Sequence, residues 1–130
     1  MPTQSSLLRY ASVGIVATAV HYVLLAALVE SGWLAPPIAA AVGAWVGAQV
    51  AFALNVRYTF RPAAVTVGSW LRFQGTAAIG AALSFALVAA GVRLGVHYLV
   101  AQAAATVLAM LLTFEINRRW SFASPTPSRD

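Results

Sequence analysis

Two arginines, Arg57 and Arg119, hold matching places in two similar segments of this chain. The segments read Asn55-Val56-Arg57-Tyr58-Thr59-Phe60 and Asn117-Arg118-Arg119-Trp120-Ser121-Phe122. A guanidinium group can hold a phosphate through two parallel hydrogen bonds, so paired arginines at one depth could bind a phosphate. Alternatively, they anchor helix ends on the cytoplasmic side, beside an aromatic belt. For a single arginine the anchor role is the more common one, but the shared order of amide, arginine, aromatic, hydroxyl and phenylalanine strengthens the case for phosphate binding, because an anchor needs no particular neighbours.

A second similarity lies upstream, where Leu8-Arg9-Tyr10 resembles Leu71-Arg72-Phe73. The offset is 63 residues between Arg9 and Arg72 and 62 residues between Arg57 and Arg119. We therefore predict two tandem helical hairpins, repeat 1 over about residues 8–60 and repeat 2 over about residues 71–122. Arg9 and Arg72 would begin the first helix of each hairpin, and would join Arg57 and Arg119 as phosphate ligands at one interface.

Five further polar side chains within or at the ends of the apolar runs are candidates for a substrate path: His21, Gln49, Asn55, Glu115 and Asn117. For the two asparagines we favour a hydrogen bond between closely packed helices, with a place on the path second. His21 fits proton coupling or contact with a polar headgroup about as well as a neutral histidine bonded to a neighbouring helix. Glu115 lies four residues before Arg119, and its favoured role is to neutralise an arginine. Gln49 lies on the corresponding face of the earlier run.

The composition indicates a membrane protein. Of the 130 residues 61% are hydrophobic and 8% are charged, whereas a soluble domain carries roughly 25% charged residues. The chain has no cysteine, which excludes disulfides and thiolate metal sites. Two histidines and three acidic residues are too few for most catalytic constellations, so we expect no enzyme, cofactor or metal site. The net charge of +5 comes from arginines beside apolar runs, which argues against nucleic-acid binding.

Four apolar runs predict four transmembrane helices, over residues 10–29, 38–54 (with the helix continuing to about residue 58), 73–92 and 96–114. Residues 30–37 and 61–70 contain glycine and proline and are expected to be connections, and residues 93–95 a short turn. The whole chain, residues 1–130, would be one all-α integral membrane domain, with a disordered tail over residues 123–130. Seven of the eight arginines fall on one side of this arrangement and only Arg93 on the other. This asymmetry predicts that both termini are cytoplasmic and that the two hairpins share one orientation.

A stripe of small residues runs along the second helix of each predicted hairpin, in steps of four residues back from the asparagine. The stripes are Ala39, Gly43, Gly47 and Ala51 in the first hairpin and Ala101, Ala105, Ala109 and Thr113 in the second. Small residues let helix backbones approach closely in membranes. Because four helices enclose little space, we expect a homodimer that packs on these stripes.

In their order along the chain, these features resemble the GtrA-like family of small four-helix bacterial membrane proteins. The resemblance covers Leu8 to Phe122, with Arg9-Tyr10 followed by Val13-Gly14, then His21-Tyr22, and the two closing segments. It implies a multi-pass protein of the bacterial inner membrane that acts in cell-surface polysaccharide synthesis. The resemblance further implies that the protein moves a polyprenyl-phosphate-linked sugar from the cytoplasmic to the outer leaflet. Arg57 and Arg119 would then meet the lipid phosphate, and His21 would contact the sugar or line its route.

Two other functions are open at this point. The chain could be a membrane anchor that recruits a glycosyltransferase, in which case its buried polar residues would be dispensable. It could also be a small proton-coupled exporter, which requires an essential buried acid. Glu115 lies near the cytoplasmic end rather than in mid-span, and this position argues against the exporter.

Overall fold

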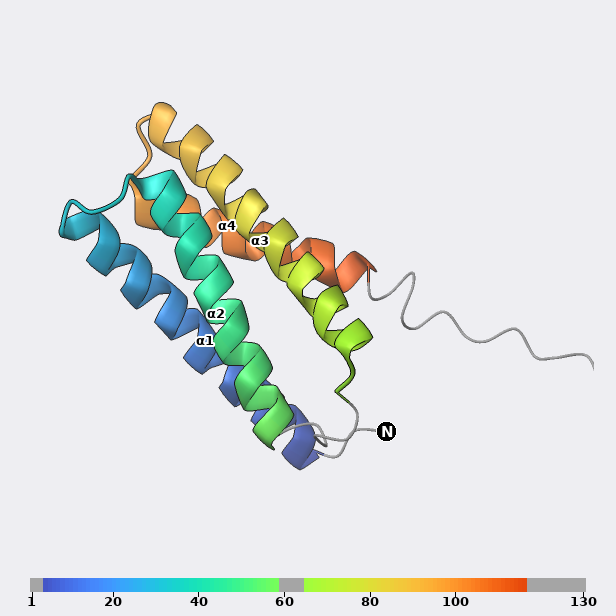
Figure 1. Cartoon of the computed structure of the whole chain (residues 1–130). Helices are drawn as coiled ribbons and strands as arrows, with labels where there is room; N and C mark the ends of the chain where they lie inside the picture. Colours follow the sequence, from blue (N-terminus) through green and yellow to red (C-terminus); the bar gives the residue numbers. More distant parts are fainter. Residues whose placement is uncertain (1–3, 59–64, 117–130) are drawn as a thin grey trace, which may run out of the picture.

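The computed structural model describes residues 4–58 and 65–116, of which residues 4–7 and 113–116 are described by their backbone alone. Within these ranges the chain forms four α-helices and no β-strand (Figure 1). The helices are α1 (Gln4–Glu30), α2 (Pro36–Tyr58), α3 (Val67–Arg93) and α4 (Tyr98–Ile116). The predicted all-α fold with four helices is confirmed.

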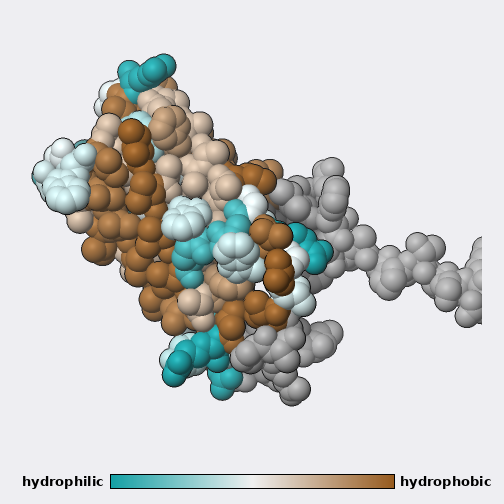
Figure 2. All heavy atoms as spheres, viewed as in Figure 1, coloured by the Kyte–Doolittle hydropathy of each residue, from teal (hydrophilic) through white to brown (hydrophobic). Residues whose placement is uncertain are grey.

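Three helices are long and apolar enough to cross a membrane, over Leu8–Glu30, Pro36–Tyr58 and Val67–Arg93. The apolar part of α4, Tyr98–Leu112, is shorter. Large apolar side chains such as Ile15 and Ile79 are exposed, and Figure 2 shows apolar surface over most of the face formed by α1 and α2. An apolar exterior of this extent suits lipid rather than water, so the prediction of a membrane protein is confirmed.

Both helical hairpins turn at a glycine in the left-handed conformation, Gly32 (φ 75°) after α1 and Gly95 (φ 82°) after α3. The amide after each glycine donates to the carbonyl five residues before it, as Val96 does to Gly91 at 2.9 Å, which is the Schellman pattern. Glycine suits these positions because it adopts positive φ without a steric penalty. The two glycines lie 63 positions apart, the offset found between Arg9 and Arg72. The tandem repeat itself stays a prediction.

Helix α3 begins at Val67, well before the predicted start at residue 73, so the expected connection over residues 61–70 is wrong for its last four residues. The cause is a capping box. Thr66 Oγ1 accepts a hydrogen bond from the Ser69 amide (3.1 Å), and Ser69 Oγ accepts one from the Thr66 amide (2.9 Å). These bonds satisfy two amides at the start of the helix. Gly68 and Ser69 therefore belong to the first turn of α3 rather than to a loop.

The helices pack in sequence, α1 on α2, α2 on α3 and α3 on α4, whereas α1 and α4 share no extensive contact among the described residues. The tightest packing lies near the two turns, in a buried core with residues from all four helices: Leu25, Ala39, Ala40, Val88, Tyr98 and Ala101. We call this region the turn end. Figure 1 shows α4 crossing obliquely behind α2 and α3. The four helices therefore meet at the turn end, and α4 diverges from the others away from it.

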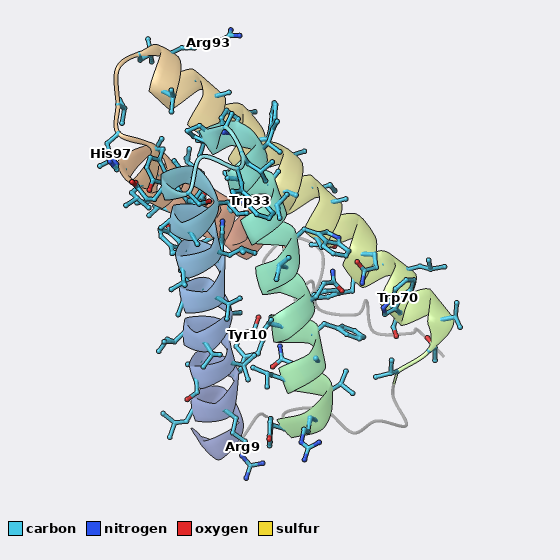
Figure 3. The ribbon with its side chains drawn as sticks, turned by 60° about the vertical axis from the view of Figure 1, so that its left-hand side comes forward. Arg9, Tyr10, Trp33, Trp70, Arg93 and His97 are labelled. Atoms are coloured by element: carbon cyan, nitrogen blue, oxygen red, sulfur yellow. The ribbon has the colours of Figure 1, made fainter. Side chains whose placement is uncertain are left out.

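The opposite end of the molecule carries Arg9 on α1, Arg57 on α2 and Arg72 on α3, and we call it the arginine end. Figure 3 shows Arg9 at this end and Arg93 at the turn end. All three arginines of the arginine end are exposed. The structure thus has its described basic side chains mainly at one end of an apolar body.

The small-residue stripe of α2 packs against α1. Ala39, Gly43 and Gly47 are buried, and a Cβ built on Gly43 or Gly47 would lie within 3.1 Å of atoms of His21. The predicted close approach of helix backbones is present, but within a single chain. The stripe of α2 is therefore not the dimer surface that we expected, because α1 already covers it. The homodimer itself stays a prediction.

Candidate functional site

A cavity of about 570 Å³, widely open to the outside, lies between the helices on the arginine side of the buried core. It extends from His21 to Gly14 along α1, from Ala44 to Ala51 along α2, from Ser84 to Phe73 along α3, and from Gln102 to Met110 along α4. In each pair the first residue lies nearer the turn end. The volume falls within the roughly 300–1,000 Å³ of small-molecule pockets. The space exists because the helices spread and because glycine and alanine make up much of its wall.

The end of the cavity nearest the core is polar, and we call it the apex: His21, Ser84, Gln102 and Thr106. Gln102 Nε2 donates to Ser84 Oγ (3.4 Å) and to Thr106 Oγ1 (3.3 Å). Thr106 Oγ1 donates to the carbonyl oxygen of Gln102 (2.9 Å) and lies 2.7 Å from the hydroxyl of Tyr22. A hydroxyl has one donor and two acceptor positions. Because Thr106 gives its one proton to the carbonyl, the Tyr22 hydroxyl must be the donor in their bond.

This network leaves two buried atoms of the apex without a partner among the described residues, His21 Nε2 and Gln102 Oε1. Gln102 is 1% exposed and both of its N–H groups are used, so its free atom is an acceptor. The imidazole of His21 and the side chain of Gln102 lie close enough to interact, but neither His21 Nε2 nor Gln102 Oε1 makes a well-aligned hydrogen bond within the described residues. A buried polar atom without a partner costs about 1–3 kcal/mol. The apex therefore holds two unsatisfied hydrogen-bonding groups at the inner end of the cavity.

Charged groups lie away from this apex in the described part of the chain. No charged residue lines the cavity there. Arg72 Nε donates to the carbonyl oxygen of Gly68 (3.3 Å), and the guanidinium of Arg57 lies 5.6 Å from the ring centre of Tyr58. At the turn end, the Tyr98 hydroxyl donates to Glu30 Oε1 (2.7 Å) and links α4 to the end of α1. The cavity thus combines a neutral polar apex with a basic opposite end.

Within the described side chains, two hydrogen bonds join α1 to α4, although the two backbones do not pack extensively. One is the Tyr22–Thr106 bond at the apex, and the other is the Glu30–Tyr98 bond at the turn end. We call this side of the bundle the α1–α4 seam. The pairs α1–α2, α2–α3 and α3–α4 all pack more closely than α1 and α4 do at this seam.

Among the predicted site residues whose side chains are described, His21 is the one that lies in the wall of the cavity. Gln49 lies elsewhere: its side-chain amide exchanges two hydrogen bonds with that of Gln74 on α3, both at 2.8 Å. Figure 2 shows a hydrophilic patch between α2 and α3, the interface that contains this pair. Asn55 Oδ1 is buried, and the bond that we expected it to make between helices is not found among the described residues.

Arg9, Arg57 and Arg72 lie exposed at the arginine end, as the phosphate-binding hypothesis requires, but their role stays a prediction. The remaining candidates fall outside the described residues, either entirely (Asn117 and Arg119) or in their side chain (Glu115). No group of metal-ligating side chains occurs among the residues that were described.

The sequence prediction missed Gln102 and Thr106. A signal existed, because an amide within an apolar run is uncommon and points to the interior of a bundle. The internal repeat gave no indication of Gln102, because residue 40, its counterpart at an offset of 62, is an alanine. Ser84 is the counterpart of His21 at an offset of 63, and both residues line the apex.

Four apolar helices and a cavity with a polar inner end define a small membrane protein with multiple apolar helices. Residues 9–122 match the family described as GtrA/DPMS, transmembrane domain, and the chain belongs to this family. The family is involved in the handling of polyprenyl-linked sugars in glycosylation. Comparisons with curated proteins and with solved structures found no match.

Proposed function

We propose that this protein translocates polyprenyl-phosphate-linked sugars from the cytoplasmic to the outer leaflet. The observation that carries the proposal is the apex, where His21 Nε2 and Gln102 Oε1 stand buried and unpartnered in a membrane-spanning domain. Membership of a family that handles polyprenyl-linked sugars supports the same function. An anchor alone would not need such a cavity.

The physical task is to move sugar hydroxyls through hydrocarbon. Each hydroxyl that loses water without gaining a partner costs roughly 2–7 kcal/mol, depending on the reference state. A cavity with polar positions at mid-depth replaces part of that lost hydration. The apolar polyprenyl chain needs no such shelter and can remain in lipid. We place its exit at the α1–α4 seam, where the helices are joined by hydrogen bonds rather than by extensive packing.

The phosphate would stay at the arginine end while the sugar enters the cavity. Arg9, Arg57 and Arg72 are exposed there, and their guanidinium groups suit phosphate oxygens. We place this end at the cytoplasmic face of the bacterial inner membrane, with both termini cytoplasmic. We expect no catalytic step and no cofactor, and we propose a homodimer and a glycosyltransferase as partners.

The test is translocation by the purified protein in liposomes that contain polyprenyl-phosphate glucose in both leaflets. A membrane-impermeant oxidant added outside modifies only the sugars of the outer leaflet. With the wild-type protein we expect the inner-leaflet sugars to become accessible over time, and with the Gln102→Leu variant to become so at least several-fold more slowly. If the protein adds nothing to the protein-free rate, the proposal fails. Retention of a glycosyltransferase on the same membranes would then favour the anchor.

A further inference from the structure

We propose that the apex selects an uncharged, hydroxyl-bearing sugar headgroup and rejects sugars that carry a carboxylate or an ammonium group. This inference rests on the proposed function and specifies its substrate class. It is carried by the hydrogen-bonding inventory of His21, Ser84, Gln102 and Thr106, and by the distance between these residues and the charged ones.

The free positions of the apex match a hydroxyl group. Gln102 Oε1 can only accept, and His21 Nε2 stands beside it as a ring nitrogen that donates or accepts according to its tautomer. One sugar hydroxyl can therefore donate to Gln102 and complete its second bond at His21. The N–H groups of Gln102 already donate to Ser84 and Thr106. The hydroxyl of Thr106 makes three hydrogen bonds, so all of its donor and acceptor positions are occupied. Few donors remain for a carboxylate, which needs several.

A charge at the apex would also lack a counter-charge. Twelve positions separate His21 from Arg9, and twelve separate Ser84 from Arg72, which is about 18 Å along each helix. Gln102 is fourteen positions from residue 116, where the description of α4 ends, or about 21 Å. On the other side, Glu30 lies nine positions beyond His21 and its carboxylate accepts the Tyr98 hydroxyl. Among the described residues, neither an ammonium nor a carboxylate at the apex would find a charged side chain as its partner, so burying it would be strongly unfavourable.

The sugar and the phosphate of the substrate would meet different ends of the cavity. The phosphate is the only charge that the site can accommodate, and it must remain near the exposed arginines while the neutral sugar reaches inward. A polyprenyl phosphate with no sugar would engage the arginine end and leave the apex empty. The apex would therefore recognise which sugar is present, and the arginine end would recognise the lipid phosphate.

The experiment compares three short-chain polyprenyl phosphates in the liposome assay, carrying glucose, glucuronic acid or glucosamine. We expect the wild-type protein to translocate the glucose lipid at least about tenfold faster than either charged lipid, which corresponds to about 1.4 kcal/mol. Free glucose in excess should not slow this translocation, since it lacks the lipid phosphate. Equal rates for all three lipids would overturn the inference and leave translocation standing. Movement of none of them would overturn the proposed function and the inference together.

A variant comparison adds a second readout. Gln102→Glu places a carboxylate at the apex, and we expect it to change the ratio of glucosamine-lipid to glucose-lipid translocation by about tenfold or more in favour of glucosamine. Ser12→Ala serves as the control, because Ser12 is exposed on α1 and bonds to the Leu8 carbonyl of its own helix. Its ratio should equal that of the wild type. An unchanged ratio in Gln102→Glu would contradict the assignment of selectivity to Gln102, and the wild-type comparison stands as a test even if this variant does not fold.

Discussion

The imidazole of His21 lies against the backbone of Gly43 with no room for a side chain between them. A Cβ built on Gly43 would stand 2.7 Å from His21 Cδ2 and 2.9 Å from the carbonyl oxygen of His21. A side-chain atom could move aside, but the carbonyl belongs to the backbone of α1 and moves only with the helix. The glycine therefore sets the spacing of α1 and α2 at the depth of the apex, and with it the position of His21.

We predict that Gly43→Ala separates α1 from α2 and destabilises the protein by about 1–3 kcal/mol, the usual cost of overpacking. The measurement is thermal unfolding of the purified protein in detergent. Gly75→Ala is the matched control, because a Cβ at Gly75 would meet nothing within 4 Å. The control should unfold at or above the wild-type temperature, since alanine favours helix. Equal stability of the two variants would contradict the close approach at Gly43.

The paired amides of Gln49 and Gln74 make a second, independent prediction about the bundle. Because the two side chains exchange two hydrogen bonds across α2 and α3, either single change to leucine leaves a partly buried amide unpaired. We expect the sum of the stability losses in the two single variants to exceed the loss in the double variant Gln49→Leu/Gln74→Leu. The coupling should be about 0.6–1.7 kcal/mol, as for other hydrogen bonds between membrane helices. Strictly additive effects in this double-mutant cycle would show that the pair contributes nothing.

The orientation in the membrane follows from the distribution of arginine, with seven residues on one side and only Arg93 on the other. We predict that a reporter fused after Asp130 is cytoplasmic and that one inserted in the connection between α1 and α2 is external. Reporters that work only inside or only outside the cell measure this directly. The reverse pattern would place the arginine end outside and remove the basis for phosphate binding there.

The paired arginines predict a specific effect of a change that conserves charge. Arg57→Lys/Arg119→Lys keeps the positive-inside signal, but an ammonium group cannot make the two parallel bonds that a guanidinium makes to phosphate. Each charge-assisted bond lost should cost about 1.5–3 kcal/mol, or roughly tenfold or more in affinity. Binding and translocation of polyprenyl-phosphate glucose should therefore fall while the protein stays folded. Wild-type rates in the double variant would leave these arginines as anchors of the helix ends.

The sequence predicted those features of the fold that depend on local chemistry. Apolar runs predicted four helices, and the glycines of the two turns were expected between them. The start of α3 was placed too late because Gly68 and Ser69 were taken as loop residues, whereas Thr66 and Ser69 cap the helix. Local chemistry was sufficient in that case too, since threonine followed by serine three residues later is a capping pattern.

The cavity is different, because no local pattern specifies the angle at which α4 crosses the other helices. That angle depends on contacts such as Gly91 with Ala101, where a Cβ on the glycine would lie 2.6 Å from the alanine Cβ. The contact holds α3 and α4 together at the turn end, and their separation further along creates the space around the apex. His21 was recognised from its type and depth, but its neighbour Gln102 became evident only once α4 was placed beside it.

The most direct test of the cavity as the sugar site is protection of a single cysteine by substrate. The natural chain has no cysteine, so Ala48→Cys introduces one reactive thiol into the cavity wall. In vesicles that expose the cytoplasmic face, a water-soluble maleimide should label it. Polyprenyl-phosphate glucose should slow that labelling, whereas polyprenyl phosphate alone should not. Ile79→Cys, on the exposed apolar surface, should stay unlabelled. If saturating glucose lipid leaves the labelling of Ala48→Cys unchanged, the sugar does not bind in the cavity between the four helices.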